Sequence, residues 1–223
     1  MKSNPLRHPE ERSLRIASRR THPLTDPATT ALKTTLRMEA RARRKGLLVQ
    51  HPEADWMAAD KAGEMLAALA LRRAGVLAIY KALGAELDPR PLGDLLTKQG
   101  WMVALPAVET EDGPLTFRAW KPGERLAPDL TGLPAPLVSA AEVRPDLILV
   151  PLLAFDRTGG RLGQGGGHYD RTLADLRTGA TPPPAVGFAF SGQETPGLPR
   201  EPHDQPLDGI LTEAGYIAVR KDT

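Results

Sequence analysis

Short continuous apolar runs alternate along the chain with longer segments that carry apolar residues at helical spacing. The runs typical of buried strands lie at residues 76–80, 101–105, 147–150 and 185–190, with shorter extended segments at 115–120, 209–211 and 217–219. The segments with helical spacing lie at residues 27–45, 52–73, 90–99 and 169–176. Strands that alternate with helices predict an α/β fold, a three-layer sandwich in which helices flank a mainly parallel central sheet. Ligands of such sheets bind beyond the carboxyl ends of the strands.

Capping and breaking residues predict where these elements end. Asp26 followed by Pro27 predicts the start of the first helix, and Gly46 predicts its end. Pro106 predicts the end of the strand at 101–105, and the proline-rich residues 122–145 predict an irregular connection. In the second helix the residues expected to face inward are Trp56, Ala59, Leu66, Leu69 and Ala70.

The first 25 residues differ from the rest of the chain. They carry many charges and several prolines and show no apolar periodicity, so we predict a flexible extension over residues 1–25. With 223 residues and 41% apolar content, the chain suits one large domain or two small ones, and we predict a single domain over residues 26–223.

Composition narrows the class of protein. The chain has no cysteine, which excludes disulfides, thiolate nucleophiles and zinc sites built on cysteine. No uninterrupted apolar run reaches the roughly 18 residues of a membrane span, and the N-terminus lacks the apolar core of a secretion signal. We therefore predict a cytoplasmic protein. A transit peptide is the alternative for the start of the chain, which Glu10 and Glu11 disfavour.

Basic residues crowd the first fifth of the chain, although Lys and Arg exceed Asp and Glu by only two overall, 29 against 27. On the first predicted helix they recur at spacings of four, four and three and share one face: Lys33, Arg37, Arg41 and Arg44. Such a face indicates an anionic ligand. A nucleic-acid-binding module is the alternative, which the lack of interleaved aromatic residues disfavours.

Five glycines fall within the eight residues from Gly160 to Gly167. Because glycine lets backbone amides converge on an anion, this segment predicts a phosphate cradle in which Arg161 supplies a fixed cation. The segment is not a Walker A motif, since glycines replace the required Lys and Ser/Thr, and it is not a dinucleotide fingerprint, since His168 replaces the third glycine. Asp170, at a predicted helix start, is either a Mg²⁺ ligand or an acid favoured by the helix dipole.

The glycine-rich segment is part of a longer pattern at residues 154–173, AFDRTGGRLGQGGGHYDRTL. This pattern closely resembles the signature of the 5-formyltetrahydrofolate cyclo-ligase (methenyltetrahydrofolate synthetase) family. Three further segments resemble that family in the same order: the spacing Lys33-x-x-x-Arg37, the segment Gly84–Asp88, and the segment Pro206–Thr212. The resemblance spans the chain from about residue 30 to its end.

The resemblance implies a reaction. Members of that family use MgATP to convert 5-formyltetrahydrofolate into 5,10-methenyltetrahydrofolate with release of ADP and phosphate. ATP and Mg²⁺ are therefore the expected cofactors, and a folate, with or without further glutamates, is the expected small-molecule partner. Phosphorylation of the formyl oxygen gives an iminium phosphate that N10 attacks, so the γ-phosphate must be held in line with that oxygen. We expect no nucleic-acid or membrane partner, and a monomer or weak homodimer.

The resemblance also implies roles for single positions, with residues 26–223 as the catalytic domain. The ATP-binding residues would be Lys33, Arg37, Arg161, Gly163, Gln164, Gly165, Gly166, Gly167 and Tyr169. The substrate-binding residues would be Lys81, Glu86, Gly165, Gly166, Gly167, His168 and Tyr169. Arg161 and Tyr169 would be catalytic, and Asp170 and Asp208 would bind the metal.

Some positions depart from the pattern or lie outside it. Arg41 and Arg44 have no match and are interpreted as a solvated helix face. His168 stands where the family has Tyr or Phe and is interpreted as a stacking or hydrogen-bonding substitute. Lys81 stands at a folate-lining position that is usually apolar or small, and it faces either the glutamate tail of folate or solvent. His203 is assigned no role. The alternative functions are an ATP-binding relative acting on another pterin-like or amide substrate and a non-catalytic phospho-ligand-binding protein.

Overall fold

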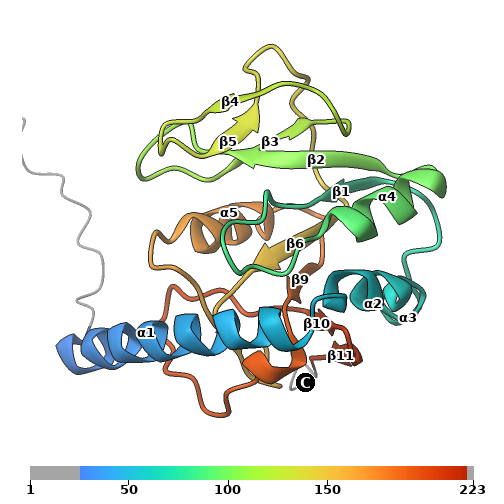
Figure 1. Ribbon diagram of the computed structural model, residues 1–223. Helices are drawn as coiled ribbons and strands as arrows, with labels where there is room; N and C mark the ends of the chain where they lie inside the picture. Colours follow the sequence, from blue (N-terminus) through green and yellow to red (C-terminus); the bar gives the residue numbers. More distant parts are fainter. Residues whose placement is uncertain (1–25, 220–223) are drawn as a thin grey trace, which may run out of the picture.

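A seven-stranded sheet forms the centre of the molecule in a computed structural model that describes residues 26–219 (Figure 1). Its strand order is β11-β10-β9-β6-β1-β2-β3. The strands are β1 Val76–Ala78, β2 Met102–Ala107, β3 Thr116–Ala119, β6 Leu147–Pro151, β9 Ala185–Phe188, β10 Gly209–Thr212 and β11 Gly215–Ala218. The inner strands pair in parallel, and the edge strands β3 and β11 pair antiparallel to their neighbours. The predicted mainly parallel sheet is confirmed.

Helices cover both faces of this sheet. They are α2 Ala54–Asp60, α3 Ala62–Ala68 and α4 Arg90–Lys98 on one face and α5 His168–Leu176 on the other. Because successive side chains of a strand point to opposite faces, Leu77 packs among residues of α2 to α4, whereas Ala78 packs in the cluster that contains Leu173 of α5. The predicted three-layer α/β sandwich is thus confirmed.

Helix α1, Pro27–Gln50, begins where the sequence predicts and ends later. The Asp26 side chain accepts hydrogen bonds from the amides of Ala28 and Thr29, so the predicted cap is confirmed. The predicted end at Gly46 is wrong, because the next residue, Leu47, packs against the core and carries the helix onward by another turn. Packing thus outweighs the low helix propensity of one glycine.

The single helix predicted over residues 52–73 is wrong. The chain forms α2 and α3 instead, separated at Lys61, whose amide bonds to the carbonyl of Ala58 in a tighter turn. Ala59 is buried as predicted and Leu66 and Leu69 pack on the core, but Trp56 is 63% exposed and Ala70 lies at the surface. The face of α2 that meets the core consists of alanines, which let the helix lie close to its neighbours.

Two further predictions fail around prolines, and one short hairpin was not predicted. Residues 122–145 are not wholly irregular, since β4 Leu126–Pro128 pairs with β5 Pro134–Pro136. Pro106 does not end its strand, because β2 continues through it to Ala107. A small hairpin of β7 Ala154–Phe155 and β8 Arg161–Leu162 was not predicted, because two-residue strands leave no periodic signal.

Among residues 26–219, no helix is long and apolar enough to cross a membrane. The flexible extension predicted over residues 1–25 lies outside the described residues and stays a prediction, as does the single catalytic domain.

Candidate active site

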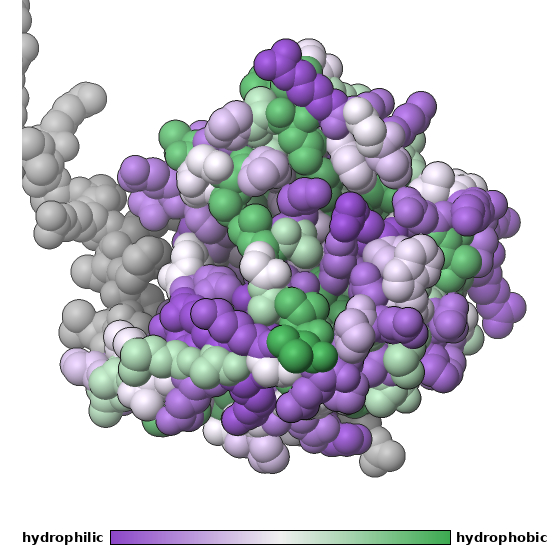
Figure 2. Space-filling model, in the orientation of Figure 1, coloured by the Kyte–Doolittle hydropathy of each residue, from purple (hydrophilic) through white to green (hydrophobic). Residues whose placement is uncertain are grey.

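A cavity of about 520 Å³ lies beyond the carboxyl ends of β1, β2 and β6. Its walls come from the segments that follow these strands, from the glycine-rich loop Gly163–Gly167 and from the first half of α1. This is the edge of the sheet at which the sequence predicts a ligand. On the molecular face that Figure 2 shows, apolar side chains gather over β4 and β5. Leu133, in the connection between these strands, and Pro134, at the start of β5, also line the cavity.

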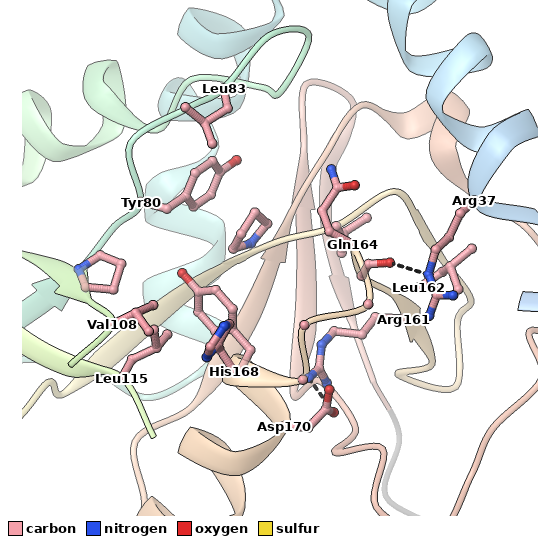
Figure 3. A pocket seen from close by; sticks show the side chains of 18 of the residues that line it. Arg37, Tyr80, Leu83, Val108, Leu115, Arg161, Leu162, Gln164, His168 and Asp170 are labelled. Atoms are coloured by element: carbon pink, nitrogen blue, oxygen red, sulfur yellow. Dashed lines mark hydrogen bonds and ion pairs between the residues drawn. The ribbon is translucent and has the colours of Figure 1, made fainter. Parts of the chain in front are cut away.

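The two ends of the cavity differ in polarity (Figure 3). One end is lined by apolar and aromatic side chains: Tyr80, Leu83, Pro106, Val108, Leu115, Leu133 and Pro134. The other end carries charged groups: Lys33, Arg37, Arg161, Asp170, Glu201 and Asp204. The glycine-rich loop, which carries Gln164, lies between them. A flat apolar ligand and a highly charged ligand can therefore bind next to each other in this cavity.

The glycines of the loop are required by its path. Gly165 has φ of +107° and Gly167 has φ of +68°, a region that L side chains rarely adopt. A side chain on Gly167 would also meet the guanidinium of Arg171, and one on Gly165 would touch Arg37. Gly167 is the N-cap of α5, so the first amides of that helix have no partner within it and are available to an anion.

Two arginines of α1 hold the loop from the other side. Arg37 Nε donates to the carbonyl of Gly163 at 3.0 Å, and Arg41 donates through Nε and Nη2 to Gln164 Oε1 at 3.1 and 2.8 Å. The terminal Nη groups of Arg37 have no hydrogen-bond partner in residues 26–219. The interpretation of Arg41 as a solvated residue is therefore incomplete, because its exposed side chain also anchors the loop.

Lys33 is buried in a cluster of acids. Its Nζ lies 2.7 Å from Glu201 Oε2 and 2.5 Å from Asp204 Oδ2. Glu201 Oε1 is buried and has no hydrogen-bond partner among the described residues. His203 completes a group whose ligand-type atoms all lie within 4.8 Å of one another. This group was not predicted from the sequence, although its Glu-Pro-His-Asp pattern ends two residues before the matched segment that begins at Pro206.

Arg161 and Asp170 form an ion pair at the cavity, with Arg161 Nη2 2.6 Å from Asp170 Oδ1. Arg161 Nη1 also donates to the carbonyl of Gln205. Burial lowers the pKa of Arg161, and the Asp170 carboxylate opposes that shift. The structure thus brings together two residues that the sequence assigned to phosphate and metal.

Asp208 does not line the cavity. Its Oδ2 accepts a hydrogen bond from the amide of Ala185 at 2.9 Å and lies 3.5 Å from Arg177 Nη2. The structure therefore does not place Asp208 beside Asp170 at the cavity surface, whereas it does place Asp204 there.

Glu86 lines the cavity with a side chain that is only 9% exposed. Its Oε2 accepts from the amide of Leu83 at 3.0 Å, and its Oε1 lies 3.3 Å from Arg44 Nη1. The interpretation of Arg44 as solvated is wrong, because α1 turns this residue inward against Glu86 and the carbonyl of Leu152. Helical spacing placed Arg44 on the right face but gave no sign of its partner.

His168 and Tyr169 line the cavity and directly follow the glycine-rich loop in the sequence. Arg171 Nη2 lies 3.0 Å from His168 Nδ1, and because arginine can only donate, Nδ1 must accept and the proton must sit on Nε2. Burial lowers the pKa of His168, and the charge of Arg171 lowers it further. Burial and the Glu86 carboxylate both raise the pKa of Tyr169. Both rings therefore offer neutral hydrogen-bond donors.

Lys81 is exposed and lines the cavity at the point where a second, smaller cavity adjoins it. That second cavity, of about 430 Å³, is bordered by Trp56, Asp88 and Trp120. This position suits both interpretations of Lys81, contact with the glutamate tail of a folate and exposure to solvent.

Comparison with known proteins decides the family. The sequence profile of the 5-formyltetrahydrofolate cyclo-ligase family matches residues 29–213. The chain belongs to the 5-formyltetrahydrofolate cyclo-ligase family. The matched range contains every residue to which the sequence analysis assigned a role.

Relatives of this cyclo-ligase family member support the assignment. It is 33% identical to the 5-formyltetrahydrofolate cyclo-ligase of Escherichia coli K12 over 177 residues, which are 77% of this chain and 95% of the relative. It is 34% identical to the enzyme of that name from Mycolicibacterium smegmatis over 149 residues, 63% of this chain and 75% of the relative.

Solved structures of cyclo-ligases share its fold. The NMR structure of Aquifex aeolicus 5,10-methenyltetrahydrofolate synthetase aligns with a TM-score of 0.68 at 28% identity, covering 86% of this chain and 95% of the other. A 5,10-methenyltetrahydrofolate synthetase from Mycoplasma pneumoniae aligns with a TM-score of 0.62 at 21% identity, covering 81% and 98%, and supports the fold alone.

Proposed function

We propose that this cyclo-ligase family member converts 5-formyltetrahydrofolate into 5,10-methenyltetrahydrofolate and cleaves ATP to ADP and phosphate. The observation that carries the proposal is the difference in polarity between the two ends of the larger cavity. There, a phosphate cradle adjoins an apolar pocket with a buried carboxylate. The cavity of about 520 Å³ is within the usual range for small-molecule sites.

ATP is proposed to bind at the charged end. The amides of Gly163–Gly167 and the start of α5 face an anion, and the free Nη groups of Arg37 are donors suited to phosphate oxygens. Arg161 adds a guanidinium whose charge is fixed in place by Asp170. Lys33 reaches the phosphates by exchanging one of its two carboxylate partners for them.

The folate is proposed to bind at the apolar end. Tyr80, Leu115 and Leu133 offer flat or aliphatic surface to the pterin and benzoyl rings, and the buried Glu86 carboxylate accepts hydrogen bonds from the amino-amide edge of the pterin. Tyr169 and His168 line the same cavity, and we propose that their neutral O–H and Nε2–H groups donate to the reacting oxygen atoms.

Oxygen ligands for Mg²⁺ are present at the charged end. Glu201 Oε1 is a buried carboxylate oxygen without a partner in the described residues, and Asp204 and Asp170 line the same wall. Carboxylate oxygens of this kind are suitable ligands for a hard divalent cation. We therefore propose that Asp170, Asp204 and Glu201 hold the ion and that Asp208, which does not line the cavity, supports the segment that carries Glu201 and Asp204. The bound ion would supply positive charge to the ATP phosphates.

The chemistry follows from this placement. The formyl oxygen attacks the γ-phosphorus and ADP leaves, N10 then attacks the activated formyl carbon and loses its proton, and the C–O bond breaks to release phosphate. The residues of this chain hold the two reactants in line and donate hydrogen bonds to developing negative charge.

The test is an assay of the purified protein with 5-formyltetrahydrofolate and MgATP, followed by the absorbance of the methenyl product. Product formation that requires ATP is the expected result. A folded protein that binds ATP but forms no product would contradict the proposal and leave an ATP-binding relative with another substrate as the better account.

We extend the proposal to the setting of the protein. It acts in the cytoplasm as a monomer or weak homodimer on a small-molecule substrate, without nucleic acid or membrane. The support for a small-molecule substrate is the size of the cavity, about 520 Å³.

A further inference from the structure

A buried arginine lies directly behind the wall of the substrate cavity. Arg44 projects from α1, is 6% exposed and does not itself line the cavity. Its Nη1 lies 3.3 Å from Glu86 Oε1 and donates to the carbonyl of Leu152 at 3.2 Å. Glu86 and Leu152 both line the cavity, so Arg44 can influence a ligand through the Glu86 carboxylate and through the backbone at Leu152. Of these two groups, only Glu86 offers a ligand a charged side chain.

The arginine is not placed there to satisfy its own hydrogen bonds. Its Nε is buried and has no partner among residues 26–219. Burying a guanidinium costs free energy that only an opposite charge offsets well, and apolar residues of similar volume would fill the space at lower cost. What the guanidinium contributes here is a positive charge opposite Glu86.

The orientation of the Glu86 carboxylate decides which ligand it recognises. A carboxylate accepts hydrogen bonds, and the direction of its lone pairs sets where the donors of a ligand must lie. One lone pair on each oxygen is engaged by Arg44 and by the amide of Leu83, which fixes the plane of the carboxylate and leaves the remaining lone pairs for a ligand. Adjacent N–H donors, such as a ring N–H beside an exocyclic amino group, match this acceptor pair.

We propose that Arg44 is a positioning residue for substrate binding, which orients the Glu86 carboxylate so that the cavity selects ligands with a paired N–H edge. The inference rests on the proposed function for the identity of the ligand. It assigns Arg44 a role in binding the folate and none in binding ATP, because the phosphate cradle lies at the other end of the cavity.

The first experiment compares Arg44→Met and Arg44→Lys with Lys45→Met, a control that removes a charge from an exposed position of the same helix. Arg44→Met is expected to raise the KM for 5-formyltetrahydrofolate about tenfold or more and to change the KM for ATP by less than about twofold. Arg44→Lys should recover most of the loss, and Lys45→Met should behave as the wild type. Equal effects on both KM values would overturn the inference.

A double-mutant cycle tests whether Arg44 acts through Glu86. Once Glu86→Gln has removed the charge, adding Arg44→Met should weaken folate binding by less than about twofold. Multiplicative losses would show that Arg44 acts by another route. If Arg44→Met alone fails to fold because it leaves Glu86 unpaired, the neutral pair in the double variant still allows the comparison with Glu86→Gln.

Direct titration of 5-formyltetrahydrofolate by calorimetry separates this inference from the proposed function. A wild type that forms no methenyl product overturns the function, but the Kd of the folate for wild type and variants still reports on Arg44. A wild type that turns over normally, with unchanged folate Kd in Arg44→Met, overturns the role of Arg44 alone.

Discussion

At the scale of single residues, the site depends on ion pairs that fix charged groups before any ligand arrives. Arg161 is 5% exposed in its side chain and is held by Asp170 and by the carbonyl of Gln205. A guanidinium fixed in this way loses little side-chain entropy when phosphate binds and presents a planar pair of donors. The role of Arg161 therefore depends on shape as well as on charge.

Replacing Arg161 tests this point. Arg161→Ala is expected to weaken ATP binding by about 30-fold or more, because removing one partner of a buried charge pair costs on the order of 2–5 kcal/mol. Arg161→Lys should recover only part of the loss, since an ammonium cannot make the paired hydrogen bonds. Calorimetric titration with MgATP measures both.

The matched control is Arg157→Ala, which removes an exposed arginine from the same hairpin region, where it pairs with Glu194. ATP affinity should not change in this variant. Similar losses in Arg157→Ala and Arg161→Ala would mean that the hairpin, and not the guanidinium of Arg161, determines binding.

At the scale of elements, the hairpin of β7 and β8 delivers Arg161 to the cavity, and one carboxylate holds its turn. Asp156 Oδ1 accepts from the amide and hydroxyl of Thr158 and from the amide of Gly160, and Arg200 lies 2.9 Å away. Burial alone would raise the pKa of Asp156, but these hydrogen bonds and the Arg200 charge outweigh it and hold the pKa below its ordinary value of 3.8.

Asp156→Asn is therefore expected to lower the free energy of unfolding by about 1–3 kcal/mol at neutral pH. Because the folded pKa of Asp156 is lowered, its contribution is complete at pH above its ordinary value and is lost as the pH falls through the folded value. The difference in the free energy of unfolding between wild type and variant should thus be smaller at about pH 3 than at neutral pH. Urea unfolding at both pH values measures it, and a constant difference would show that ionisation of Asp156 does not stabilise the turn.

Elements were predictable where one signal decides them. The short apolar run at 147–150 predicts a buried strand, and the structure shows it fully buried in the central sheet. The helix start at Asp26 and Pro27 is encoded by these two neighbouring residues alone. The end of α1 and the break at Lys61 depend on contacts with residues far away in the sequence. Leu47 of α1 and the buried alanines of α2 both pack in the same core cluster. The β7 and β8 strands are too short for a period, so only the folded chain reveals them.

At the scale of the whole molecule, the sheet brings four distant segments to one cavity: α1, the segment after β1, the glycine-rich loop and the segment before β10. The family resemblance located residues in each of them, and the folded chain shows which ones face inward. Asp204 and Asp208 are four residues apart, yet only Asp204 lines the cavity, and Arg44 has its partner Glu86 42 residues further along the chain. Such pairings leave no trace in spacing or composition.

The central claim is that this cavity holds the γ-phosphate of ATP against the formyl oxygen of the folate. The measurement that tests it most directly uses 5-formyltetrahydrofolate labelled with ¹⁸O in the formyl group and follows the label by mass spectrometry of the released phosphate. Because the formyl oxygen becomes bonded to phosphorus before the C–O bond breaks, each phosphate should carry one labelled oxygen. Methenyl product accompanied by unlabelled phosphate, or ATP cleavage that leaves the folate unchanged, would contradict the account.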